Sequence, residues 1–369
     1  MMTVFLFFVV LGVLVLVHEL GHFWAAKLSG VKVEEFGIGI PPKAYGFTPK
    51  NSEVEYSINW LPIGGFVRIF GENYDDNDIV SPDFGRSFVN AKKYKQIFIL
   101  IAGVLMNFIA AIVLLSAAAW LGNLVPVESP EQADGFYVAS VSPGSPADEA
   151  GLPAGVEILA ISDGEQSIPA TDLTNERFAE LITESEQSVI IQYMQDDESG
   201  GVVTVEPETG LILDEPDRQA IGVYADNFVF QRAGFFEGIA SGWNQSVNGI
   251  VMITSSFADL ITDSFSGNGG ETFKSLAGPV GIAQLSAQAY EVGIGSLFTF
   301  AAILSLNLVV LNMLPVPALD GGRIVFVIIE TLRGKPLNPK YAGMANAIGF
   351  GLLLLLMLAI TVQDIVRVF

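Results

Sequence analysis

Four stretches of about 20 mostly apolar residues limit what this chain can fold into more than any other feature of its sequence. They cover residues 4–28, 96–121, 295–314 and 344–366. Each is long enough to cross a bilayer as a helix, and a helix satisfies its own backbone hydrogen bonds in lipid. With 51% hydrophobic and 16% charged residues, the chain is too apolar for an ordinary soluble enzyme. The sequence therefore predicts a polytopic α-helical membrane protein with four transmembrane helices.

The first apolar stretch could instead be a cleaved signal peptide. No Lys or Arg precedes it, however, and no small-residue cleavage site stands before its charged flank. It also contains the motif His-Glu-Leu-Gly-His at residues 18–22, and a stretch with such a motif is a poor candidate for a segment that is cleaved off. We expect residues 1–28 to remain as the first transmembrane helix.

The charged residues are distributed unevenly, and their distribution predicts the orientation. Segment 123–295 holds 27 acidic and 4 basic residues, whereas loop 29–95 holds 8 Lys or Arg and loop 316–343 holds 4. Because short basic loops stay in the cytoplasm, both of these loops are expected there and the acidic segment outside. An acidic surface repels nucleic-acid phosphates, so nucleic acid is not expected as a partner.

The acidic segment is expected to contain one folded domain over residues 127–210. Alternating apolar residues predict strands in FYVASV, VEILAIS, SVIIQYM and GVVTVEP, and helical spacing covers 172–184. Residues 211–229 are expected to form a linker. The stretch 234–260 is expected to be a helix that lies in the membrane interface, against the spans, or on the outer domain. Residues 264–271 have the composition of a loop.

The cytoplasmic segment contains VEEFGIGIPPKAYGF and VEYSINWLPIGGFVRIFGE. Its alternation, its Pro-Pro pair and its Gly-Gly pair predict a β-hairpin or small sheet. This element directly follows the first helix, so it could turn back towards the membrane.

His18 and His22 are the only histidines of a chain that has no cysteine. At positions i and i+4 their side chains share one helix face and can bind one Zn²⁺. Glu19 lies on a neighbouring face, where a carboxylate can accept a proton from water. Two imidazoles and a carboxylate inside a spanning helix cost several kcal/mol unless they are paired or metal-bound, which indicates a functional site. The structural alternative is a histidine pair that is merely hydrogen-bonded in a helix bundle.

Two histidines leave a zinc site short of a protein ligand, and Asp320 is the expected third one. It ends the third span in NMLPVPALDGGR, where Pro315 and Pro317 break the helix. Broken helix at membrane depth is tolerated where it lines a polar cavity. The predicted orientation puts His22 and Asp320 at the same side of the membrane, whereas the rival Asp364 falls at the outer side.

Two of the asparagines in the apolar stretches are candidates for a role in polar contacts. Asn312 could hydrogen-bond either an extended substrate backbone or a neighbouring helix. Asn107, in the second span, is expected to contribute to helix packing.

Taken together, these motifs resemble the site-2 protease family, on the branch of the bacterial regulator of sigma-E protease. The resemblance covers essentially the whole chain, with HELGH, AGVLMNF and LSLNLVVLNMLPVPALDGGR in the first three spans and PIGGFVRIFGE in the cytoplasmic loop. VSPGSPADEAGLPAGVEILAISDGE resembles a PDZ domain of the permuted bacterial type. The chain departs from the pattern by having one PDZ-like unit where the best-known branch has two. Val104 and Val156 also replace the usual Pro and Asp.

The resemblance implies an intramembrane zinc metalloendopeptidase that cleaves single-span membrane proteins, such as anti-sigma factors or remnant signal peptides, usually after another protease has cut first. It implies an active site with substrate-binding residues around it: His18, His22 and Asp320 as zinc ligands, Glu19 as general base, and Asn312, Gly64 and Gly65 as substrate-binding residues. The implied location is the bacterial plasma (inner) membrane, with the PDZ-like domain extracytoplasmic and the bilayer as a further partner.

The expected order of segments follows from these observations. Helix 1 covers 1–28, the cytoplasmic loop with its membrane-associated β-element 29–95, helix 2 96–122, and the PDZ-like α+β domain 127–210. A linker and amphipathic helical region covers 211–294, helix 3 with the LDG motif 295–322, and helix 4 344–366.

Three other functions are compatible with parts of this pattern. A membrane scaffold could capture extended peptides by strand addition through the PDZ-like domain, but it would need neither His-Glu-x-x-His nor Asp320. A membrane-anchored protease acting on soluble substrates would need ligands in the outer segment, which has no histidine. A transporter could have four spans, yet no inverted repeat is visible.

Overall fold

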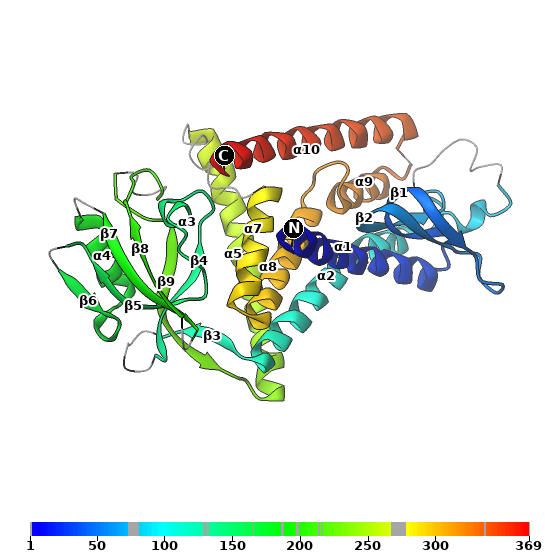
Figure 1. Ribbon diagram of the computed structural model, residues 1–369. Helices are drawn as coiled ribbons and strands as arrows, with labels where there is room; N and C mark the ends of the chain where they lie inside the picture. Colours follow the sequence, from blue (N-terminus) through cyan, green and yellow to red (C-terminus); the bar gives the residue numbers. More distant parts are fainter. Residues whose placement is uncertain are drawn as a thin grey trace.

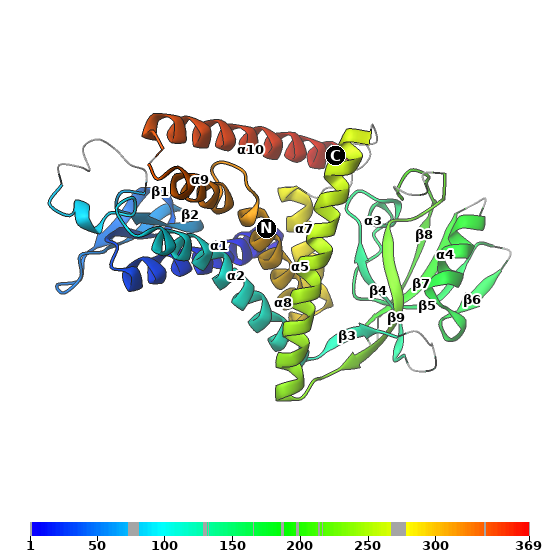
Figure 2. The ribbon, with the colours of Figure 1, turned by 180° about the vertical axis from the view of Figure 1, so that it is seen from behind.

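The computed structural model describes residues 2–72, 81–127, 131, 133–164, 166–185, 188–196, 199–212, 215, 217–266, 278–335 and 337–368. The long helices form the middle of the molecule, with a sheet domain on one side and a two-stranded hairpin on the other (Figure 1). The view from behind shows the same order, with the long helix α5 in front (Figure 2). The general architecture expected from the sequence, apolar helices with an attached β-containing domain, is confirmed.

Four helices are long and apolar enough to cross a membrane: α1 (Met2–Ser29), α2 (Lys93–Leu121), α8 (Ile294–Met313) and α10 (Pro339–Val368). They coincide with the four predicted apolar stretches. Only 6% of the apolar window of α10 is buried inside the protein, against 39% for α2 and α8. Because a bare apolar helix is stable in lipid but not in water, this exposure agrees with a membrane protein.

The third span and the LDG motif, grouped as one segment over 295–322 in the expected order, belong to separate helices on either side of Pro315 and Pro317. Helix α8 ends at Met313, and a new helix, α9 (Asp320–Arg333), begins at Asp320. Gly321 and Gly322 lie in the first turn of α9. A Cβ on either residue would overlap a backbone carbonyl of the preceding turn, so glycine is needed there for close approach.

The hairpin consists of the antiparallel strands β1 (Val33–Phe47) and β2 (Glu55–Ile69). Its inner end is buried, since Val33 and Ile69 pack in one cluster with Phe23 of α1 and Ile99 of α2. Its outer end exposes large apolar side chains: Ile38, Ile40, Tyr45, Ile58, Trp60 and Leu61. Exposed apolar patches of this kind are typical of membrane or partner contacts.

The sheet domain contains the strands β3 (Asn123–Pro126), β4 (Gly135–Val141), β5 (Glu157–Ser162), β6 (Ser167–Pro169), β7 (Val189–Asp196), β8 (Ser199–Val205) and β9 (Val223–Gln231). Their order is β3-β9-β4-β5-β7-β8, with β6 paired to β5. Helices α3 (Pro146–Glu149) and α4 (Asn175–Glu184) complete the domain. The apolar face of α4, with Phe178 and Leu181, packs on strand residues such as Phe136 and Ile158. The domain thus has its own hydrophobic core.

Strand β9 lies where the sequence predicts the end of a linker, over 211–229. It pairs with both β3 and β4, so the sheet extends over 123–231 rather than ending at residue 210. Asp226 and Asn227 interrupt the apolar alternation of VYADNFVF, and this interruption hides the strand in the sequence. Asn227 is tolerated in the buried sheet because its Nδ2 donates to the carbonyl oxygen of Leu173 at 3.0 Å.

Helix α5 (Phe235–Ser266) packs against the spans, which is one of the three locations considered for residues 234–260. The Trp243 ring centroid is 5.7 Å from that of Phe108 in α2. The loop predicted over 264–271 begins within the last residues of α5, and the rest of it lies outside the described residues.

Helix α7 (Pro279–Val292) connects the sheet domain to α10. At its start, the Asp364 carboxylate of α10 accepts hydrogen bonds from the backbone N–H groups of Gly278, Val280 and Gly281 at 2.9–3.1 Å. Near its end, the Gln288 amide bonds both the N–H and the carbonyl of Val141 in β4, at 3.2 and 2.9 Å. Asp364, the rival metal ligand, is therefore engaged as a helix cap.

Candidate metal centre

The two histidines of α1 project from one face of the helix, because they are four residues apart. Both are nearly buried, at 8% and 7% exposure for His18 and His22. Their Nε2 atoms lie 3.0 Å apart. At this distance at least one of the two nitrogens must be unprotonated, with its lone pair directed at the other. A cation between them would be bound by the lone pairs of both nitrogens.

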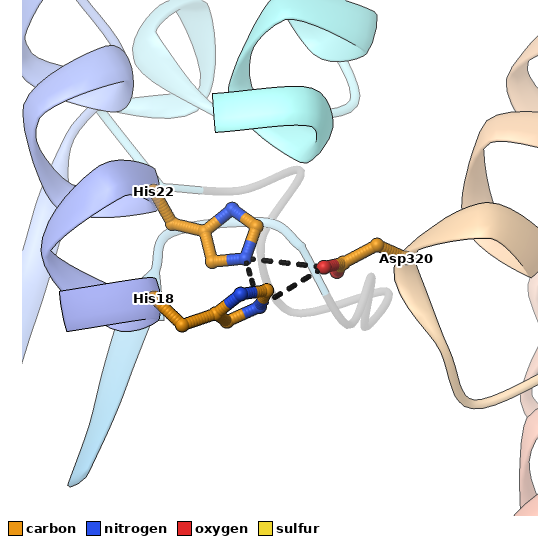
Figure 3. Close-up of side chains that lie close together, drawn as sticks. All are labelled: His18, His22 and Asp320. Atoms are coloured by element: carbon orange, nitrogen blue, oxygen red, sulfur yellow. Dashed lines mark hydrogen bonds and ion pairs between the residues drawn. The ribbon is translucent and has the colours of Figure 1, made fainter. Parts of the chain in front are cut away.

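Asp320 completes the group from the first turn of α9, which starts directly after the proline-containing turn. Its Oδ2 lies 3.1 Å from His18 Nε2 and 3.4 Å from His22 Nε2 (Figure 3). Among the residues that the structure describes, these three form the one cluster of His, Cys, Asp or Glu ligand atoms within 4.8 Å of one another. The helix break at Met313 is what lets a carboxylate from α9 face α1.

The donor set fits a zinc ion. Ligands about 2.0–2.1 Å from tetrahedral zinc lie roughly 3.3 Å from each other, and the three observed separations are 3.0, 3.1 and 3.4 Å. Two imidazole nitrogens and one carboxylate oxygen are ligands that zinc prefers, and three protein ligands leave a fourth position open, as catalytic zinc sites require. A geometry of this kind can support hydrolysis.

Helix α2 supplies polar groups to the outer side of both imidazoles. His22 Nδ1 lies 2.8 Å from the carbonyl oxygen of Ile99, and His18 Nδ1 lies 3.3 Å from the Asn107 amide. Sequence reasoning assigned Asn107 to packing and missed the Ile99 carbonyl. The signal for Asn107 was present, since a buried amide in an apolar span needs a polar partner.

Glu19 is directed away from α2, towards the hairpin. Its Oε2 accepts a hydrogen bond from the backbone N–H of Val67 in β2 at 3.0 Å. Oε1 is left for a second partner, because a carboxylate has two acceptor oxygens. The hairpin therefore orients the carboxylate that neighbours the His–His–Asp cluster, a contact that no sequence pattern reveals.

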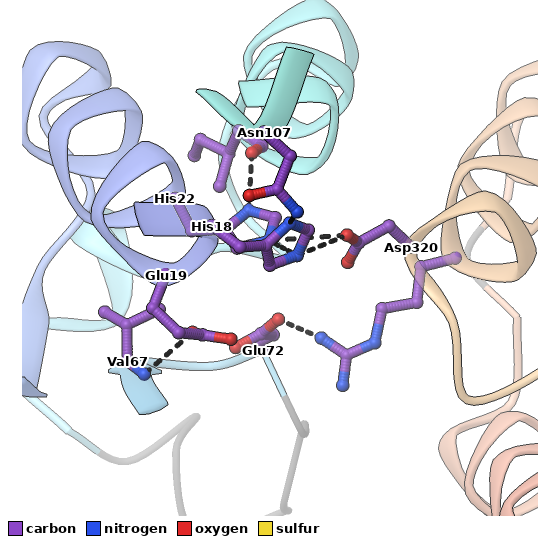
Figure 4. Close-up of polar contacts among 9 residues, drawn as sticks. His18, Glu19, His22, Val67, Glu72, Asn107 and Asp320 are labelled. Atoms are coloured by element: carbon purple, nitrogen blue, oxygen red, sulfur yellow. Dashed lines mark hydrogen bonds and ion pairs between the residues drawn. The ribbon is translucent and has the colours of Figure 1, made fainter. Parts of the chain in front are cut away.

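A second polar pair lies close by. Arg323, one turn after Asp320 in α9, donates to the Glu72 carboxylate, and Figure 4 shows Glu72 near Glu19. Sequence reasoning did not single out either residue, although Glu72 ends the PIGGFVRIFGE motif and Arg323 follows the LDGG motif.

The predicted substrate-binding residues lie outside the His–His–Asp cluster. Gly64 and Gly65 lie within β2, where Gly64 has φ 69° and both approach Val15 and Leu16 of α1. They therefore lie one helical turn before the histidine motif. Asn312 lies in the last turn of α8 and is partly buried.

Comparisons with known proteins identify a family for this chain. The model of peptidase family M50 matches residues 6–356. A relative in Clostridium perfringens is 35% identical, with 96% of this chain and 95% of the relative covered. The regulator of sigma-W protease RasP of Bacillus subtilis is 29% identical over 100% of this chain and 99% of its own length. The zinc metalloprotease RasP of Bacillus licheniformis is 30% identical with both chains fully covered.

A family match over nearly the whole chain includes α1, α2, α8 and α9, which carry or border the His–His–Asp cluster. The chain therefore belongs to peptidase family M50, the site-2 proteases, and is a zinc metalloendopeptidase.

Proposed function

We propose that this protein cleaves the transmembrane segment of single-span membrane proteins at a zinc held by His18, His22 and Asp320. One observation carries the proposal. Ligand atoms of His18, His22 and Asp320 converge beside α1, the apolar helix that also carries Glu19 and is long enough to span a membrane. Polar groups at such a depth are costly unless they have a function.

Different residues would bind the metal and transfer the proton. Zinc, when bound, acts as a Lewis acid that makes water nucleophilic near neutral pH. Glu19 accepts the proton of the attacking water at Oε1, because Val67 N–H holds Oε2. The same carboxyl then donates that proton to the leaving amine.

The substrate must be extended at the scissile bond, because a helix hides its carbonyls. Strand β2 runs beside α1 at Gly64 and Gly65, so a substrate strand can lie next to it. Asn312, at the end of α8, is placed on the helix that leads to Asp320 and would hydrogen-bond the substrate backbone.

The sheet domain would act as an extracytoplasmic, PDZ-like size filter in the bacterial plasma membrane. A cavity of about 620 Å³ separates it from the helices, with Ser140 and Tyr224 on one wall and Gln245, Gln288 and Thr299 on the other. A substrate shortened by an earlier cut could pass this space, whereas a folded outer domain could not. Anti-sigma factors and remnant signal peptides are the expected substrate class, since a relative is named a regulator of sigma-W protease.

The first experiment is the zinc content of detergent-purified protein, wild type beside His18→Ala. We expect about one zinc per chain, lost in the variant, because two protein ligands hold zinc poorly. Cleavage of a single-span substrate in liposomes, with and without a folded outer domain, then tests the substrate class. Zinc-free wild type prepared without chelators would overturn the site and favour the peptide-capturing scaffold.

A further inference from the structure

One face of α2 follows the histidine pair of α1 along its length. Ile99, Gly103 and Asn107 are spaced at i, i+4 and i+8, so they lie on one side of the helix. The Ile99 carbonyl meets His22 Nδ1, and the Asn107 amide meets His18 Nδ1.

Gly103 lies between these two groups and lets α2 approach closely. A Cβ at this position would overlap His22 Nε2 and come within 2.8 Å of His18 Cε1. Any side chain at this position would therefore displace the imidazoles or move α2 away from α1. The spacing of small and polar residues on α2 matches the spacing of the two rings on α1.

The two imidazoles have different outer partners. His22 Nδ1 faces a backbone carbonyl, which can only accept, so this nitrogen carries hydrogen and Nε2 keeps its lone pair. His18 Nδ1 faces an amide, which can either donate through Nδ2 or accept through Oδ1. The side chain of Asn107 thereby decides which nitrogen of His18 can bind a cation.

The amide of Asn107 is fully buried, and its Oδ1 is one of the buried side-chain oxygens of the described residues that make no hydrogen bond. A half-turn of the amide would exchange Oδ1 and Nδ2 with almost no change in shape. Oδ1 would then accept from His18 Nδ1–H and leave the Nε2 lone pair for the metal. This arrangement satisfies the unpaired oxygen and matches the role of the Ile99 carbonyl at His22.

We infer that Asn107 is a positioning residue for the metal centre, which accepts a hydrogen bond from His18 Nδ1–H and so fixes the tautomer and orientation of this ligand. Such outer partners set metal affinity, and their loss typically weakens it by about 10–100-fold. Ser305 Oγ of α8 donates to the Asn107 backbone carbonyl at 2.8 Å, which anchors α2 at this residue without using its side chain. The inference rests on the proposed zinc site.

The test measures zinc affinity by competition with a chromophoric chelator in detergent. Asn107→Leu keeps the volume but removes the acceptor, and we expect its zinc dissociation constant to rise roughly 10–100-fold. Ser116→Ala, another buried polar position of α2 away from the rings, serves as the matched control and should leave it unchanged. Equal affinity of the Leu variant and wild type would overturn the inference, whereas zinc-free wild type would overturn the site itself.

A spectroscopic readout separates positioning from a general loss of structure. The chain has only two histidines, so ¹⁵N-histidine labelling yields two imidazole spin systems. In zinc-loaded protein we expect both rings to carry hydrogen on Nδ1, and Asn107→Leu should shift the Nδ1–H signal of His18 alone. His22, bonded to the Ile99 carbonyl, is the internal control. A shift of both rings or of neither would contradict a specific role of Asn107.

Discussion

At the scale of single residues, the proposed base Glu19 and the proposed ligands His18 and His22 are oriented by different elements. His18 and His22 face α2, whereas Glu19, on the adjacent side of α1, is bonded to the backbone of β2. A hydrogen bond from a backbone N–H depends on no side chain of the hairpin, so it tolerates sequence change in β2. The carboxylate is thus oriented before a substrate arrives, which is the arrangement that general base catalysis favours.

Replacement of Glu19 by Gln should abolish cleavage while leaving the metal site intact. The amide oxygen of Gln can still accept from Val67 N–H, but an amide cannot take up a proton. We expect cleavage of a single-span substrate to fall by about 100-fold or more. Zinc content should stay near the wild-type value.

The matched control is Glu34→Gln, which removes a carboxylate from the exposed side of β1. It should retain wild-type cleavage, because Glu34 contacts Arg68 and not the cluster. Cleavage by Glu19→Gln at a rate close to that of Glu34→Gln would exclude Glu19 as the base.

At the scale of elements, α10 has a defined role although it is little buried. The turn that delivers Asp320 contains Ala318 with φ 81°, a conformation that costs a non-glycine residue about 1 kcal/mol or more. Asn346 of α10 accepts the Ala318 N–H at 3.1 Å through Oδ1. The last apolar helix therefore supports the turn between α8 and α9, and through it the position of Asp320, the proposed third ligand.

Asn346→Leu should loosen this turn. Loss of the hydrogen bond removes roughly 1 kcal/mol from the native turn, and we expect zinc affinity to fall by about tenfold or less. Chelator competition measures the change.

A second substitution tests whether the turn is the cause. Ala318→Gly accepts a positive φ without strain, so it should restore part of the affinity in the Asn346→Leu background. If Ala318→Gly leaves the affinity of Asn346→Leu unchanged, the effect of Asn346 does not pass through the turn.

At the scale of the whole molecule, the sheet domain is inserted between α2 and α5, and its contacts with the helices among the described residues include two sets of hydrogen bonds. Ala233 N–H, just before α5, donates to the Ala119 carbonyl near the end of α2 at 2.9 Å, so the chain enters and leaves the domain at neighbouring points. The second set is the pair of hydrogen bonds between the Gln288 side chain and the Val141 backbone. The domain can thus be removed without separating the helices.

Replacing residues 123–231 by a short Gly-Ser linker tests the size filter. The strands β3 and β9 must be removed together, since a deletion that ended at residue 210 would leave β9 in the protein without its pairing partners. We expect the shortened protein to cleave substrates with folded outer domains at a rate about tenfold or more above that of the full chain. The reason is that the sheet domain no longer excludes such substrates sterically.

The control is the same deletion combined with Glu19→Gln, which should be inactive. Unchanged selectivity of an active, zinc-containing deletion protein would mean that the sheet domain does not filter substrates.

The sequence by itself determined the four apolar helices, the zinc protease family and the residues that could form the cluster. These features depend on local patterns: about 20 apolar residues for a span, and an i, i+4 spacing for two ligands on one helix face. A chain with two histidines and no cysteine also leaves few alternatives for a zinc site. For that reason the choice of His18, His22 and Asp320 needed no coordinates.

Only the tertiary structure decided what surrounds those residues. The Ile99 carbonyl, the Val67 N–H and the Asn346 amide come from other elements, and contacts between distant segments have no periodic signature. Strand β9 was hidden for a related reason, because its buried Asn227 is satisfied by a residue 54 positions away. Local sequence patterns report which face of an element is apolar, whereas packing decides which polar group meets which.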